Sequence, residues 1–299
     1  MPLPPLSAIR CFEAAARHLS FTRAAEELGM TQAAVSYQIK LLEDRFGPLF
    51  LRKARGVALT EAGRSLAPAV TDAFATLRAA FEDVTRTAEG VLVVSAVNTF
   101  ASNWLVPRLG AFQMAHPAIA VRLDVTGRLV DFAREEVDVG IRSGEGPWPG
   151  LTAHRLKPVE YTPVLSPHLL ERAGPLACPA DLLKLPLVDP QDPWWADWFA
   201  AAGVGAADDL PAELSRRPDI RVGTQPLAAG VALSGQGVAI VTPGFFREEI
   251  ASGRLVQPFP LVHTSGASYW LVYPEARRRS AKIRAFRDWL LDAVAASND

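Results

Sequence analysis

The 299-residue chain has few of the features that mark secreted, membrane-spanning or redox-active proteins. It contains only two cysteines, Cys11 and Cys178, which lie far apart in the sequence and are expected to be free thiols, with a redox switch as the alternative. No apolar run approaches the length of a membrane span. The first residues lack the basic segment and apolar core of a secretory signal, so we expect the chain to act in the cytoplasm.

The motifs of the common enzyme classes are missing as well. The sequence has no Gly-x-Ser-x-Gly elbow, no His-Glu-x-x-His, no phosphate-binding loop and no Gly-x-Gly-x-x-Gly opening a helix. Its five histidines are scattered without the spacing of metal ligands. We therefore expect no catalytic residues, no metal and no cofactor. An enzyme and a secreted solute-binding protein remain as the competing function classes.

Residues 20–46 have the pattern of two helices joined by a tight turn. Thr22 is the predicted N-cap of a short helix over residues 23–28, and Gly29 is expected to end it in the left-handed conformation. Thr31 then caps a second helix that runs toward residue 46. Its apolar stripe is expected to face the bracing helices and consists of Val35, Ile39, Leu42 and Phe46.

The opposite face of this second helix is polar. Its first turn carries Gln32 and Ala33, an amide and a methyl group that suit adenine and thymine edges in a major groove. Ser36 and Tyr37 follow on the same face. Lys40 lies further back, where a phosphate contact is expected.

A basic hairpin is predicted directly after the second helix. Two short apolar runs, residues 49–51 and 57–59, flank the cations Arg52, Lys53 and Arg55. The whole chain has a net charge of −1, yet residues 1–66 hold nine Lys/Arg against six Asp/Glu. An ordinary helical hairpin with a solvated polar face is the alternative. The order and spacing of the three elements favour a winged helix-turn-helix that binds duplex DNA.

A long helix is predicted from Thr60 onward. Its apolar or small residues alternate steps of four and three, which is typical of a coiled coil that forms a dimer. A helix packed on its own domain is the alternative. The repeat consists of Leu66, Val70, Ala73, Leu77, Ala80 and Val84.

Strands and helices alternate after residue 90, so the larger part of the chain is predicted to be α/β with largely parallel strands. Trp194, Trp195 and Trp198 form a cluster in the sequence, of which Trp194 and Trp198 are expected to pack into the second lobe rather than to form an aromatic box. The expected elements cover residues 91–96, 101–114, 119–125, 129–135, 138–141, 159–165, 179–183, 185–188, 227–233, 238–242, 268–273 and 281–295.

A ligand is expected at the carboxyl ends of the strands, where helix N-termini offer free backbone donors. The loop after the first strand is the primary candidate. A capping or core role is the alternative for each side chain. The candidate ligand-binding residues are Asn98, Thr99, Phe100 and Ser102 in that loop, and Asp131, Thr224, Gln225 and Tyr269 elsewhere.

Several segments together resemble the LysR-type transcriptional regulators. They are residues 6–14, 20–28, 31–36, 49–50, 59–63, 103–109, 112–113, 116–117 and 286–290. The resemblance implies a winged helix-turn-helix over residues 1–59, a linker helix over 60–89 and an effector-binding domain over 90–299. It further implies a two-lobed, periplasmic-binding-protein-like effector domain, with lobe I at 91–164 and 266–299 and lobe II at 165–265.

The resemblance also implies partners. Members of this family form homodimers that pair into tetramers, bind promoter DNA and a small-molecule effector, and act on RNA polymerase. The segments are most similar to the AmpR and GcvA branch, in which ligand contacts correspond to Thr99, Asp131, Thr224 and Tyr269. Asn98 and the Thr224-Gln225-Pro226 segment depart from the AmpR pattern. The effector is therefore left open between a muropeptide, an amino acid and another small carboxylate.

Overall fold

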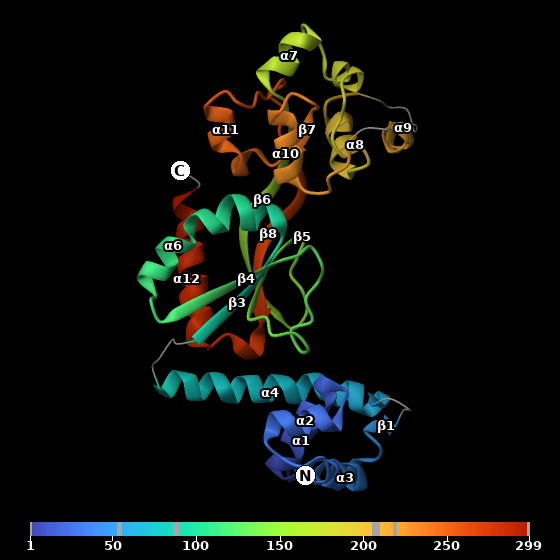
Figure 1. Ribbon diagram of the computed structural model, residues 1–299, viewed down its shortest axis with the longest axis vertical. Coiled ribbons are helices and arrows are strands. Elements are labelled where there is room, and N and C mark those ends of the chain that lie inside the picture. Colours follow the sequence, from blue (N-terminus) through green and yellow to red (C-terminus); the bar gives the residue numbers. More distant parts are fainter. Residues whose placement is uncertain (1, 53–55, 86–89, 205–209, 218–219, 298–299) are drawn as a thin grey trace.

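The computed structural model describes residues 2–52, 56–85, 90–204, 210–217 and 220–297. Its N-terminal helices lie at one end, a long helix follows, and a six-stranded sheet with its helices makes up the rest (Figure 1). Within the described residues, no helix is long and apolar enough to cross a membrane.

The N-terminal part contains three helices, α1 (Leu6–His18), α2 (Phe21–Leu28) and α3 (Gln32–Phe46), which share a core of alanines, Phe12, Val35 and Ile39. Gly29 has a φ of +64° and ends α2, and Thr31 Oγ1 accepts from the Ala34 N–H, as predicted.

Two details of the helix-turn-helix differ from the prediction. The N-cap of α2 is Ser20, which accepts from the Arg23 N–H, and Thr22 lies inside the helix. Ser20 has the extended backbone that an N-cap requires, and both residues can cap, so the sequence alone did not separate them. Phe46 is 39% exposed because α3 ends there, past the edge of the core.

The hairpin strands are β1 (Phe50–Arg52) and β2 (Val57–Leu59), which pair antiparallel with Phe50 opposite Leu59. Helix α4 (Glu61–Thr85) follows, and Thr60 Oγ1 accepts from the Gly63 N–H at its start. This helix contacts α1 on one side and the short helix η4 (Glu275–Arg277) on the other.

The sheet has the order β4-β3-β5-β8-β6-β7. Its strands are β3 (Gly90–Ala96), β4 (Ile119–Val125), β5 (Val139–Gly144), β6 (Leu151–Val164), β7 (Ala239–Val241) and β8 (His263–Pro274). Strand β3 is parallel to β4 and β5, whereas the pairs β5–β8, β6–β8 and β6–β7 are antiparallel. The predicted largely parallel sheet is therefore wrong, because β6 and β8 run in opposite directions along one another.

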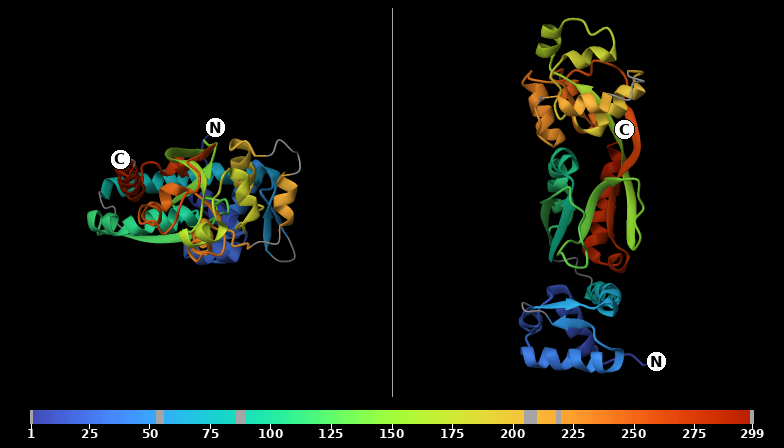
Figure 2. Two further views of the ribbon diagram at one scale, coloured as in Figure 1. Left: turned by 90° about the horizontal axis from the view of Figure 1, so that it is seen from above. Right: turned by 90° about the vertical axis from the view of Figure 1, so that its right-hand side faces the viewer.

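Two lobes are joined by β6 and β8, as Figure 2 shows in its right-hand view. The sheet lobe consists of β3, β4, β5, most of β6 and β8, a helical run made of α5 (Asn98–Phe100), η1 (Ala101–Leu105) and α6 (Val106–Ala115), and α12 (Ala281–Ala296). The distal lobe consists of β7, α7 (Pro167–Ala173), η2 (Pro179–Lys184), α8 (Pro193–Ala201), α9 (Leu210–Arg216), α10 (Gln225–Leu233), η3 (Pro243–Phe245) and α11 (Arg247–Ala251).

Two expected elements are weaker than predicted. Residues 129–135 form turns rather than a helix or strand. Residues 185–188 contribute only one isolated bridge, between Leu187 and Val238. Both segments are short, and in a short segment the apolar pattern alone does not decide whether a helix or a strand forms.

Candidate functional site

The first candidate site is the exposed face of α3. Its buried side, formed by Val35 and Ile39, anchors the helix on α1. The residues predicted to contact DNA lie on the other side, where Thr31, Gln32, Ala33, Tyr37 and Lys40 are exposed and Ser36 is half-buried. A rigid helix with a free first turn can enter a major groove.

A groove of about 560 Å³ separates α3 from the hairpin. Ser36, Tyr37 and Lys40 line one side and Arg52 the other. Lys53 and Arg55, the other predicted phosphate contacts, lie outside the described residues. The exposed face of α3 and one cation of the hairpin, Arg52, therefore line the same groove.

Glu43 is a structural residue of this site that the sequence analysis missed. Its Oε1 accepts from the backbone N–H groups of both Leu49 and Phe50, each at 2.9 Å. The carboxylate therefore fixes the first hairpin strand to the end of α3. A single acidic residue in a helix gives no sequence signal for such a contact.

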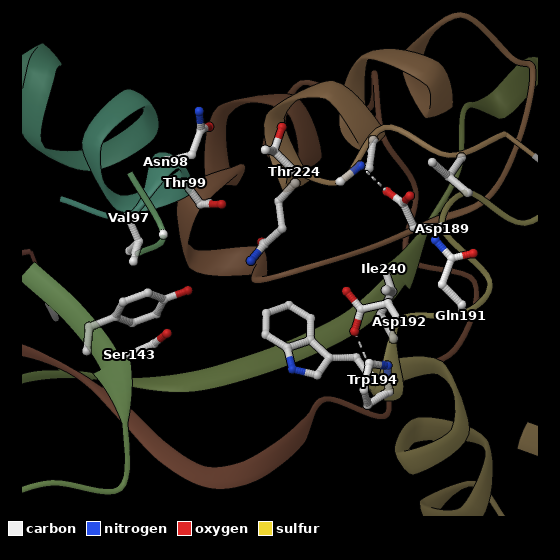
Figure 3. Close-up of a pocket in the computed structure, with 17 residues that line it drawn as sticks. Val97, Asn98, Thr99, Ser143, Asp189, Gln191, Asp192, Trp194, Thr224 and Ile240 are labelled. Atoms are coloured by element: carbon white, nitrogen blue, oxygen red, sulfur yellow. Dashed lines mark hydrogen bonds between the residues drawn. The ribbon is translucent and has the colours of Figure 1, made fainter. Parts of the chain in front are cut away.

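The second candidate site is a cavity of about 570 Å³ between the two lobes (Figure 3). One wall comes from the start of the helical run after β3, and the other from the loops that precede α8 and α10. Five of the eight predicted ligand-binding residues line it. They are Asn98, Thr99, Thr224, Gln225 and Tyr269.

The wall on the sheet lobe is built where β3 ends. Strand β3 stops at Ala96 and the helical run starts at Asn98, so Asn98 and Thr99 lie at a helix N-terminus past the carboxyl end of a central strand. Ser143, from the neighbouring β5, lies on the same wall. Backbone donors and hydroxyls at such a point favour a ligand oxygen or anion.

The wall on the distal lobe includes the N-terminus of α10. Thr224 is the N-cap residue, but its hydroxyl makes no cap hydrogen bond, and Oγ1 is buried without a partner among the described residues. Gln225 is held in place because its Oε1 accepts from the Thr242 N–H at 2.7 Å.

Tyr269 closes the cavity from β8. It is only 3% exposed, and its ring lies 5.6 Å from that of Phe100 and 5.3 Å from that of Phe245. Burial raises the pKa of the Tyr269 phenol, although its side-chain hydrogen bonds with Thr242 and Gln225 act in the opposite direction, so the phenol stays protonated.

Three predicted ligand-binding residues contribute nothing to the cavity wall. Phe100 is fully buried and supports Tyr269 from behind. Ser102 is exposed outside the cavity. Asp131 is exposed too, accepts from the Ala133 N–H at 3.0 Å and pairs with Arg134 at 3.5 Å. The contacts of Asp131 are therefore those of a local cap, which was the alternative to ligand binding.

The acidic part of the cavity was not predicted from the sequence. Asp189, Gln191, Asp192 and Trp194 line the distal wall. Asp189 accepts from the N–H groups of Val222 and Gly223 at 2.8 and 2.9 Å, and Asp192 caps α8 through the Trp194 N–H at 3.0 Å. Trp194 is half-buried: it packs against the core, as expected, and also lines the cavity.

Trp194 is held flat against Tyr161, with ring centroids 4.5 Å apart and planes 3° apart. One face of the indole is thus covered by a core residue. Asp192 could have been proposed from the sequence, because residues that cap a helix after a strand in an α/β fold often lie near the ligand. Nothing in the sequence indicated that Asp189 and Asp192 would face Thr99 across one cavity.

Comparisons with known proteins cover nearly the whole chain. Residues 6–64 match the family model described as bacterial regulatory helix-turn-helix protein, lysR family, and residues 85–295 match the LysR substrate binding domain. The chain is 42% identical over 300 residues to the glycine cleavage system transcriptional activator of Escherichia coli (strain K12), covering 99% of this chain and 96% of that one. It is also 42% identical over 301 residues to the transcriptional activator AmpR of Pseudomonas aeruginosa, covering 98% and 97%.

Solved structures agree with these sequence matches. The effector domain of Pseudomonas aeruginosa AmpR superposes with a TM-score of 0.58 at 36% identity, over 69% of this chain and 96% of that one. ArgP from Mycobacterium tuberculosis has the same fold over 98% of both chains, with a TM-score of 0.65 at 20% identity.

Proposed function

The chain belongs to the LysR-type transcriptional regulators, and from this premise we propose how its two sites divide the work. It is a DNA-binding regulator whose promoter activity is controlled by a small-molecule effector, and it is not an enzyme. We assign its DNA-binding part to residues 1–59, its linker helix to residues 60–89 and its effector-binding part to residues 90–299.

At the DNA site, we assign base reading to the first turn of α3 and phosphate binding to the groove and hairpin. Gln32 and Ala33 present an amide and a methyl group from an exposed first turn. Lys40 and Arg52 both line the groove, and we assign each of them to a phosphate. Lys53 and Arg55 are assigned to phosphates on their sequence position.

At the effector site, the proposal rests on one observation: the cavity lies between two helix N-termini that belong to different lobes. Thr99 lies at the N-terminus in the sheet lobe and Thr224 at that of α10 in the distal lobe. A ligand that contacts both favours one angle between the lobes, and this differential contact is what couples binding to conformation.

The linker helix α4 is assigned to dimerisation. Leu77 is 45% exposed and Phe81 is 72% exposed, although both are apolar. A second copy of the chain would cover them, and two winged helices on one duplex would then meet two half-sites. From membership of the family, we further propose that dimers pair into tetramers, that the regulator contacts RNA polymerase and that it acts in the cytoplasm.

A promoter-reporter assay tests the effector site. The reporter carries the intergenic DNA upstream of the chain's own gene. Thr99→Val removes the hydroxyl at nearly constant shape, so the response to the inducing condition is expected to disappear while DNA binding in a gel shift persists. Ser102→Ala, a hydroxyl three residues away and outside the cavity, is the matched control and should respond like the wild type. An unchanged response of Thr99→Val refutes the assignment.

A further inference from the structure

A second cavity, of about 760 Å³, lies where the DNA-binding part meets the sheet lobe, and we call it the interdomain cavity. Helix α4 lies between the two parts in Figure 1, and its residues Thr71 and Arg78 line this cavity together with Glu13 of α1. The interdomain cavity shares no lining residue with the cavity between the lobes. A segment that reaches both cavities can therefore pass a change at one of them to the other.

Residues 126–137 form such a segment, and we call them the strap. They connect β4 to β5 through bends and turns, without a helix or a strand. Gly127, near the start of the strap, lines the cavity between the lobes, whereas residues 132–136 line the interdomain cavity. The strap thus extends from the one cavity to the other along the sheet lobe.

The strap is held together by its own side chains and backbone. Arg128 pairs with Glu135, and the Glu135 carboxylate also accepts from the Asp131 N–H at 2.9 Å. The N–H groups of Arg134 and Glu135 donate to Asp131 O, at 3.0 and 2.9 Å. Because these bonds join its beginning to its end, we expect the strap to move as one unit.

Arg277 of η4 holds the end of the strap that lies at the interdomain cavity. Its Nη1 donates to Val137 O and its Nη2 to Phe132 O, each at 2.9 Å. The guanidinium also lines the interdomain cavity, and η4 directly follows β8, the strand that carries Tyr269. A displacement of the strap therefore displaces Arg277.

Helix α4 meets Arg277 through charges of opposite effect. It packs on η4, and Thr76 Oγ1 donates to Ala276 O at 3.4 Å. Burial lowers the pKa of the Arg277 guanidinium and Arg78 of α4 adds to this, whereas nearby carboxylates, Asp72 of α4 among them, act in the opposite direction. Asp72 thus attracts Arg277 and Arg78 repels it, so a small displacement changes the balance between the two.

The beginning of α4 is fixed to the DNA-binding part. It packs on α1, and Gly63 approaches Leu49 O so closely that the space between them holds no Cβ. Thr60 Oγ1 also accepts from the Gly63 N–H at 3.0 Å. A shift of α4 against the sheet lobe therefore moves the winged helix-turn-helix with it.

We propose that the strap links the cavity between the lobes to helix α4 within a single chain. A ligand that displaces the Gly127 end moves the strap, and Arg277 transmits this movement to Asp72 and Arg78. Arg277 is thereby a positioning residue for the winged helix-turn-helix. The inference rests on the proposed effector role of the cavity and adds a regulatory route that needs no second copy of the chain.

Hydrogen exchange of the ligand-free full chain tests this link. The N–H groups of Arg134, Glu135 and Val137 are hydrogen-bonded within the strap, so their exchange reports on its opening. Asp72→Lys and Arg78→Glu reverse the charges of two exposed α4 side chains. We expect Asp72→Lys to accelerate this exchange about 2- to 5-fold and Arg78→Glu to slow it by the same factor.

Arg279→Glu is the matched control. Arg279 is exposed, lies two residues from Arg277 and is outside the interdomain cavity, so its strap should exchange like that of the wild type. A promoter reporter without inducer is the second readout, and Asp72→Lys and Arg78→Glu should shift its activity in opposite directions. The inference is overturned if the strap exchanges alike in all variants, if the distal-lobe helices change as much as the strap, or if the two variants do not shift the promoter oppositely.

Failure of this link differs from failure of the effector role. If the α4 variants leave strap exchange unchanged while Thr99→Val still abolishes the promoter response, the link is refuted and the effector role stands. If the strap responds to the α4 variants while Thr99→Val responds like the wild type, the effector role is refuted and the contact between strap and α4 stands.

Discussion

Glu43 accepts hydrogen bonds from the backbone N–H groups of Leu49 and Phe50, and thereby fixes helix α3 to the hairpin. We expect Glu43→Ala to destabilise the N-terminal part by about 1–3 kcal/mol, because two N–H groups lose a charged acceptor. Hydrogen exchange of the peptides over α3 and β1 measures this. Asp44→Ala removes the exposed neighbouring carboxylate and should change little; equal effects of the two variants would contradict the account.

Gln32 and Arg52 are expected to differ in how they affect DNA binding. Gln32→Ala should weaken the specific operator by about 1–3 kcal/mol and leave random DNA almost unaffected. Arg52→Ala should weaken both and lower the slope of log K against log salt by about 1. Gel-shift titrations over a range of salt concentrations measure both quantities. Identical behaviour of the variants would refute the division between base reading and phosphate binding.

The contact of Arg17 with Glu27 joins α1 to α2 and should make this region acid-sensitive. Arg17 Nη2 lies 2.6 Å from Glu27 Oε1, and its hydrogen bond lowers the pKa of Glu27 below the ordinary 4.5. The stabilisation is therefore fully present above pH 4.5 and is lost as the pH falls through the lowered value. Because Glu27 is partly exposed, Glu27→Gln should cost only about 0.5–1 kcal/mol at pH 7.

Hydrogen exchange of the α1 and α2 peptides is the suitable readout for Glu27→Gln. All seven tryptophans lie in the effector-binding part, so tryptophan fluorescence does not report on these helices. Glu26→Gln, an exposed neighbour, is the control. A difference between wild type and Glu27→Gln that persists unchanged at acid pH would contradict the ion-pair explanation.

Asp192 should show the opposite pH dependence. Burial raises its pKa, so the native state binds a proton more readily than the unfolded chain, and this contribution is lost as the pH rises through the raised value. Asp192→Asn is therefore expected to raise the Tm of the ligand-free protein at pH 7 by a few degrees at most, with the gain vanishing below the ordinary value of 3.8. Tryptophan fluorescence suits this measurement, and a lower Tm at pH 7 would contradict it.

The sequence predicted local features well where one residue type decides the conformation. Gly29 ends α2 with a positive φ, and Thr31 caps α3, because both depend on nearest neighbours. The antiparallel direction of β6 and β8 was not predicted, since both strands end in a continuous buried run of the kind that is typical of parallel sheets.

The candidate effector site shows the same limit. Thr99 and Thr224 could be identified because Thr99 lies at the start of the helical run after β3 and Thr224 directly precedes α10. Asp189 and Asp192 could not, because only the packing of the distal lobe against the sheet lobe brings them opposite Thr99. Asp131 has the right residue type near a helix-like segment, yet it faces solvent.

The central claim is that the cavity between the lobes controls the winged helices of the same chain. The most direct measurement is the operator Kd and DNA bend angle of wild type and Thr99→Val, with and without whichever muropeptide, amino acid or other small carboxylate raises the Tm most. We predict that this compound changes the wild-type complex and leaves the Thr99→Val complex unchanged. A compound that binds the cavity tightly but alters neither the Kd nor the bend of the wild-type complex would contradict the account.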